Sequence, residues 1–173
     1  MEVYHSQPIV DAVIRFVEND PTSENTVKAM ASGILNYSFL PADGYVVTSA
    51  NRNNNFGFII LRLQGGVPGD RSIIHHTFAK AKPASDDPQA SLGELEKALE
   101  HANTQFGRCW AIMIHGINFK FYEYHRNLPE HARLIPWSPP DEPQRNSFHA
   151  RNDSVEIDSM LRHMAQNDTP PAR

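Results

Sequence analysis

The sequence has a single cysteine, Cys109, among its 173 residues, which excludes an internal disulfide. It also has no uninterrupted apolar run that approaches the roughly 18 residues a membrane-spanning helix needs, so we expect no membrane-embedded segment. The opening residues lack the basic and apolar regions of a secretory signal peptide. These absences together predict an intracellular, reducing environment, with the cytoplasm as the simplest compartment.

Positive charge is scarce as well. The 16 lysines and arginines are outnumbered by 20 aspartates and glutamates, which gives a formal net charge of −4. No excess cationic field is available to attract a phosphate backbone, so nucleic acid is disfavoured as a partner. The hydrophobic fraction of 40% is that of an ordinary globular protein, and the length suits one domain, so we expect residues 1–173 to form a single domain.

Apolar residues at helical spacing predict four helices. The first two have apolar stripes at 9–17 and 27–35. The third follows a capping box at Ser91 to Glu94 and extends to Phe106, and the fourth covers 153–166. We expect the third helix to pack on a sheet through its leucines.

Runs of β-branched and aromatic residues predict about five strands, at 45–50, 56–63, 72–82, 109–115 and 119–124. The predicted fold is therefore α/β (α+β), with a central mixed sheet flanked by helices in the order αβββαββ, followed by a C-terminal helix. Residues 6–125 would form the core. The glycine-rich stretch from Gln64 to Asp70 precedes a strand rather than a helix, which favours a hairpin loop over a phosphate site.

Prolines dominate the region after His125. They predict an extended wrap without regular structure over 126–149, with Trp137 as the large anchor that holds it to the domain. After the C-terminal helix, we expect residues 167–173 to be a frayed tail.

In the predicted strand at 72–82, successive side chains point to opposite faces of the sheet. His76, Phe78 and Lys80 would share one face of the sheet. His75 would lie on the other face with small residues such as Ala79. Because small residues suit close packing, we expect the His75 face to lie under the third helix.

Residues 56–124 also resemble a known family. The stretches "FGFIILRL", "SIIHHTFAKAK" and "RCWAIMIHGINFKFYEYH" are similar in pattern to the degenerate PD-(D/E)XK nuclease-like domains of uncharacterised fungal proteins. The resemblance implies a divalent metal held by an acid on the second strand and by an acid-x-lysine pair on the third. At those positions this chain has Gly57 or its neighbours for the first acid, Phe78 for the second, and Lys80 for the lysine. If Lys82 is taken as the lysine instead, Lys80 stands in the place of the acid.

These replacements argue against nuclease chemistry. Magnesium needs oxygen ligands, usually including carboxylates, and there is no acid between Ala50 and Gly69. His75 and His76 point to opposite faces, so they do not form a simple pair of metal ligands. Cys109 lies in an apolar strand, where a buried, inert thiol is expected. The sequence thus predicts no metal site, no cofactor and no metal-dependent cleavage.

Two hypotheses about function remain open, with a residual nuclease as a weaker third. The first is a metal-free, cofactor-free enzyme of isomerase or cyclase type acting on a small organic molecule. In it His76 would be the acid or base, and Lys80 or Arg62 would polarise an oxygen. The ligand pocket would be formed by Phe78, His115 and Tyr122.

The second hypothesis is a non-catalytic module that binds a protein partner through the proline-rich wrap or a sheet edge. The shape of the face around Phe78 distinguishes the two hypotheses. An enclosed pocket reached by His76 and Lys80 favours the enzyme, whereas a filled face favours the module.

Overall fold

The computed structural model describes residues 2–52, 55–64 and 72–173. The predicted glycine-rich loop falls mainly on residues outside these ranges. Within them the helices are α1 (Pro8–Asn19), α2 (Glu24–Ser38), α3 (Pro88–Leu99) and α4 (Ser154–Gln166), with short 3-10 turns η1 (Tyr4–Ser6), η2 (Pro41–Asp43) and η3 (Gln105–Gly107). No helix in the described part of the chain combines the length and apolar character needed to cross a bilayer.

One mixed sheet forms the centre of the molecule. Its strands are β1 (Tyr45–Arg52), β2 (Asn55–Gln64), β3 (Ser72–Lys82), β4 (Arg108–His115), β5 (Asn118–His125), β6 (Leu134–Trp137) and β7 (Phe148–His149). The order is β1-β2-β3-β4-β5-β6, and β7 pairs with β5. Strands β3 and β4 are parallel because α3 crosses over between them, and the other pairs are antiparallel. The predicted fold class is confirmed, although the sheet has more strands than the five expected.

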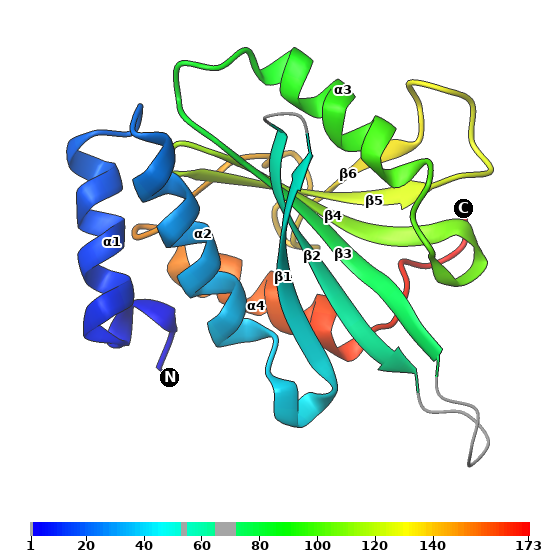
Figure 1. The fold of residues 1–173 in the computed structure, drawn as a ribbon, viewed down its shortest axis with the longest axis horizontal. Coiled ribbons are helices and arrows are strands. Elements are labelled where there is room, and N and C mark those ends of the chain that lie inside the picture. Colours follow the sequence, from blue (N-terminus) through cyan, green and yellow to red (C-terminus); the bar gives the residue numbers. More distant parts are fainter. Residues whose placement is uncertain (1, 53–54, 65–71) are drawn as a thin grey trace.

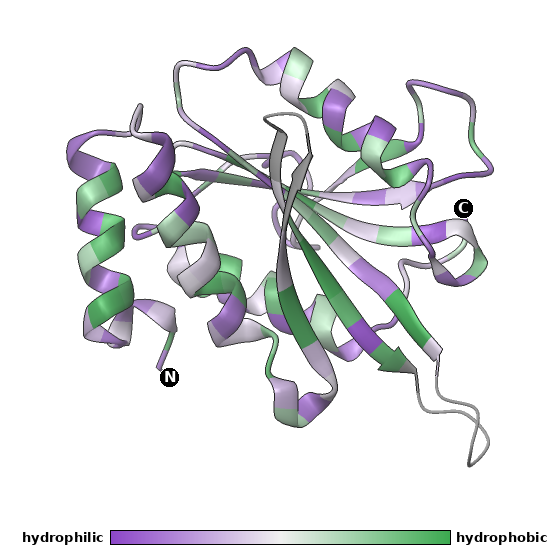
Figure 2. Cartoon of the chain, viewed as in Figure 1, coloured by the Kyte–Doolittle hydropathy of each residue, from purple (hydrophilic) through white to green (hydrophobic). Residues whose placement is uncertain are grey.

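Helices cover both faces of this sheet (Figure 1). On one face α2 and α4 enclose the larger core, and α1 lies on the outer side of α2. On the opposite face α3 covers a smaller core by itself. In Figure 2 the central strands carry hydrophobic segments interrupted by hydrophilic ones, the latter most clearly on β3.

One prediction about the proline-rich region is wrong, and one agrees with the structure. The proline-rich region contains β6 and β7 rather than only irregular structure. Strand β6 tolerates Pro136 because it lies at an edge of the sheet, where a missing N–H disrupts little pairing. Trp137 does anchor this region, since its ring centroid lies 5.0 Å from that of Trp110 and 5.1 Å from that of His163.

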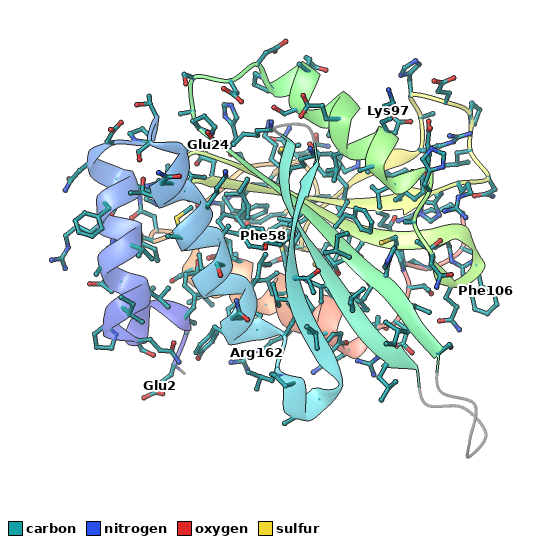
Figure 3. The ribbon with its side chains drawn as sticks, in the orientation of Figure 1. Glu2, Glu24, Phe58, Lys97, Phe106 and Arg162 are labelled. Carbon is teal, nitrogen blue, oxygen red and sulfur yellow. The ribbon has the colours of Figure 1, made fainter. Side chains whose placement is uncertain are left out.

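Helix α3 begins earlier than predicted. Asp87 caps it by accepting a hydrogen bond from the backbone N–H of Gln89, and Pro88 follows at the first helical position. Ser91, the predicted cap, is buried within the helix. The helix ends at Leu99, so Phe106 lies beyond it with its side chain 75% exposed, directed away from the molecule in Figure 3.

The prediction that α3 packs through its apolar stripe is confirmed, because Leu95 and Leu99 belong to the smaller core. Ala102, predicted in the same stripe, also belongs to this core but follows the end of the helix. The predicted partner face is wrong. The helix packs on the Phe78 side of β3, whereas Ala79 faces the larger core with α2.

Candidate functional site

A β-bulge in β3 separates the predicted catalytic residues. In the pairing with β2, Thr77 is opposite Ile60 and His75 is opposite Leu61, so His76 has no residue opposite it. Such an extra residue reverses the alternation of side chains along the strand. The expectation that His76 shares a face with Phe78 and Lys80 is therefore wrong.

His76 lies in the larger core, fully shielded from solvent. Its Nε2 donates to the Asn167 carbonyl at 3.1 Å, and its Nδ1 accepts from the Thr77 hydroxyl at 2.7 Å. The rings of Phe39 and Tyr45 pack edge-on against it, with centroids 5.7 and 5.2 Å away. Burial lowers the pKa of His76 from 6.5 to about 4. Both nitrogens are used inside the fold, and neither faces an open pocket.

Arg62 lies on the same side of the sheet as His76. Its Nε is 2.7 Å from the Asp168 carboxylate, and its guanidinium carbon is 4.6 Å from the centroid of the Tyr45 ring. Arg62 and His76 therefore both contact the segment that follows α4. The structure brings these two predicted residues together, but on a covered surface.

Lys80 lies on the opposite face, under α3. Its Nζ is 3.5 Å from Glu94 Oε2, and the Nζ of Lys82 is 3.2 Å from the same oxygen. Both lysines are buried, and burial lowers the pKa of Lys80 although the Glu94 carboxylate opposes the shift. Two buried ammonium groups thus share one carboxylate, which is a compact charge cluster beneath the helix.

The three predicted ligand-binding residues also lie on the α3 side. Phe78 and Tyr122 are buried in the smaller core, and burial raises the pKa of Tyr122. His115 ends β4, with its Nε2 2.8 Å from the Asp86 carbonyl in the loop before α3. These side chains share a face with Lys80, but α3 fills it.

The predictions missed a second set of buried polar residues, on the α4 side of β5. Glu123 is 1% exposed and His125 is fully buried, with His125 Nε2 3.6 Å from Glu123 Oε2. Arg173 approaches the same carboxylate oxygen through Nε at 2.9 Å and Nη2 at 2.8 Å. A signal was present in the sequence, because alternation places Glu123 and His125 on the same face as Phe121.

The residues needed for metal or thiol chemistry are not assembled in the described ranges. These contain no group of three or more histidine, cysteine, aspartate or glutamate side chains placed to hold a metal ion. Cys109 is buried, burial raises its pKa, and its thiol lies 3.3 Å from the His76 carbonyl. A thiol in this state is a weak nucleophile.

A hollow of about 530 Å³ lies away from all these residues, between the N-terminal helices. It is lined by Gln7, Ile9, Val10, Gly33, Asn36, Tyr37 and Leu40. Ile9, which lines the hollow, is 71% exposed, and Phe16 on the same helix is 58% exposed. None of the predicted site residues contributes to this hollow.

Comparisons with known proteins add no constraint: no family model matches the chain, and no curated protein or solved structure was found to be similar. The resemblance to nuclease-like domains therefore stays a prediction, and function has to be argued from the residues.

Proposed function

We propose that this protein is a non-catalytic interaction module that binds an amphipathic helix of a partner protein along α1. The observation that carries the proposal is the exposed apolar stripe on α1. Ile9 and Phe16 are seven residues apart, and the half-buried Ala12 and Val13 lie between them. This i, i+3, i+4, i+7 spacing is the pattern by which helices recognise one another.

The apolar surface of α1 is wider than its packing against α2 requires. At 100° per residue, the stripe and the inward-facing Val10, Ile14 and Val17 together cover an apolar arc of about 200°. An arc of about 100° suffices for a helix that packs on one neighbour, and α2 already covers the inward half. Figure 2 shows hydrophobic residues along α1 at the outer edge of the molecule.

The hollow beside the stripe gives a partner side chain a place to insert. Leu40 at its edge is 44% exposed, and Tyr37 and Gly33 form part of its wall. Full burial of a side chain such as Ile9 or Phe16 contributes about 1.5–3 kcal/mol. Apolar side chains that become fully buried at the centre of an interface are typical hot spots.

The state of the predicted catalytic residues favours the module over the enzyme. An acid or base has to come within hydrogen-bonding distance of its substrate, and both nitrogens of His76 are used inside the core. Lys80 is covered by α3 and paired with Glu94. Side chains and α3 fill the face around Phe78, where the enzyme hypothesis requires an enclosed pocket, and this supports a binding role.

A selection experiment tests the proposal. Helical peptides from a displayed library are selected on the wild-type protein and titrated against the double variant Ile9→Ser/Phe16→Ser. We expect at least a tenfold loss of affinity. Phe106→Ser, which removes a still more exposed phenylalanine elsewhere, is the matched control and should bind as the wild type does. Selected helices that bind the double variant equally well would contradict the proposal, as would wild-type self-association through α1 that excludes the peptides.

A further inference from the structure

A row of polar side chains lies on the α4 side of the sheet, at the end where β4 begins. Arg62, His76, Trp110, Glu123 and His125 come from four neighbouring strands. A sheet covered on both faces normally presents apolar residues to its cover. Enclosing a carboxylate such as that of Glu123 costs several kcal/mol unless a counter-charge accompanies it. The charged and imidazole groups of this row therefore need polar partners from the segment that covers them.

Residues 167–173 cover this row in the structure. In Figure 1 the red segment leaves α4 and runs to the far end of the sheet. The expectation of a frayed tail is wrong, because the Asn167 carbonyl accepts hydrogen bonds from Trp110 Nε1 at 2.9 Å and from His76 Nε2 at 3.1 Å. Asp168 then pairs with Arg62, and Pro170 is buried.

The last contact of the segment is the most specific one. Two nitrogens of the Arg173 guanidinium approach the buried Glu123 carboxylate, at 2.8 and 2.9 Å. Beside them His125 is fully buried, and neither of its ring nitrogens has a hydrogen-bond partner among the described residues. A guanidinium fits this site better than an ammonium, because its planar array of N–H groups can address a carboxylate through two donors at once.

We propose that this polar row is a recognition groove for an extended peptide carrying a carboxylate and, five residues later, an arginine, and that residues 167–173 occupy it as an internal ligand. Arg62 pairs with the carboxylate, and Glu123 pairs with the guanidinium. Trp110 and His76 donate hydrogen bonds to the peptide backbone. A partner segment with the same two charges would bind by displacing the internal one. This groove is separate from the α1 stripe, so the two proposals can fail independently.

Competition from residues 167–173 determines how tightly an added peptide should bind. A tethered segment competes at an effective concentration of about millimolar, which weakens the apparent affinity of any peptide added in solution. Removing both charged anchors of the segment, in the double variant Asp168→Ala/Arg173→Ala, should relieve this competition. The groove residues themselves are unchanged in that variant.

The probe is a fluorescein-labelled peptide with the sequence of residues 167–173, followed by fluorescence polarisation. We expect it to bind the double variant at least tenfold more tightly than the wild type. Replacing the peptide's arginine with alanine should cost at least a further tenfold, and replacing it with lysine should cost less. Arg15→Ala, which breaks a surface pair with Asp11, is the matched control and should bind the peptide no better than the wild type.

Circular dichroism first establishes that the double variant is folded. If it is not, the wild-type protein is titrated to millimolar peptide, where the arginine peptide must bind and the alanine peptide must not. The proposal is overturned if the folded variant shows no saturable binding, or if the arginine and alanine peptides bind equally well. It is also overturned if adding Glu123→Gln to the folded double variant leaves the preference for arginine intact.

Discussion

Protonation of His76 should make the stability of this protein fall steeply below neutral pH. In the unfolded chain its imidazole takes up a proton near pH 6.5, whereas in the folded protein burial lowers the pKa to about 4. Between these values the unfolded state binds more protons than the folded state. The free energy of unfolding therefore decreases as the pH is lowered through this window.

The expected size of the effect follows from the two pKa values. At about 1.4 kcal/mol for each tenfold difference in proton affinity, the full contribution of His76 is about 3 kcal/mol. Between pH 7 and pH 4.5 most of it is lost, which amounts to about 2–3 kcal/mol. For a protein that is marginally stable, this is a large share of the total.

The assay is urea unfolding followed by circular dichroism at pH 7 and at pH 4.5, for the wild type and for His76→Gln. Glutamine does not titrate, so the wild type should lose about 2–3 kcal/mol more than the variant on acidification. His101→Gln, which replaces an exposed histidine, is the control and should follow the wild type. Equal acid sensitivity in the wild type and His76→Gln would refute the assignment of a buried, neutral imidazole.

Two further predictions concern α3. Leu99→Ala should lower the free energy of unfolding by about 2–5 kcal/mol, because Leu99 is fully buried and its truncation leaves a cavity; a loss below 1 kcal/mol in urea unfolding would argue against this packing. Glu94→Gln should cost about 1–3 kcal/mol at pH 7, because the buried Lys80 and Lys82 lose their shared counter-charge. The exposed Glu130→Gln is its control, and equal stability of the two variants would refute the role of Glu94.

The sequence alone determined most of the secondary structure, because this information is local. Strand β3 was predicted with its observed bounds, 72–82, and the C-terminal helix to within one residue of its start. Hydrophobic spacing reports which residues alternate or repeat along an element. It also identified the mixed α/β class, because a helix between two strands favours a parallel pair.

The sequence also identified Arg62 and His76 as polar residues worth attention, although for reasons of catalysis. It could not place them relative to Lys80. One extra residue in the pairing of β2 with β3 reverses every side chain beyond it, and alternation read along a single strand contains no record of such a bulge.

Tertiary structure alone decided what covers each face. Residues 167–173 have the composition of a frayed terminus, and groups distant in sequence, among them the Glu123 carboxylate and the Trp110 indole, give them a defined position. The small residues Ala79 and Ala81 likewise suited either helix layer, and they face α2 rather than α3. Local propensity and periodicity act within a few residues, whereas the pairing of a buried charge or the choice of a packing partner depends on groups brought together by the whole chain.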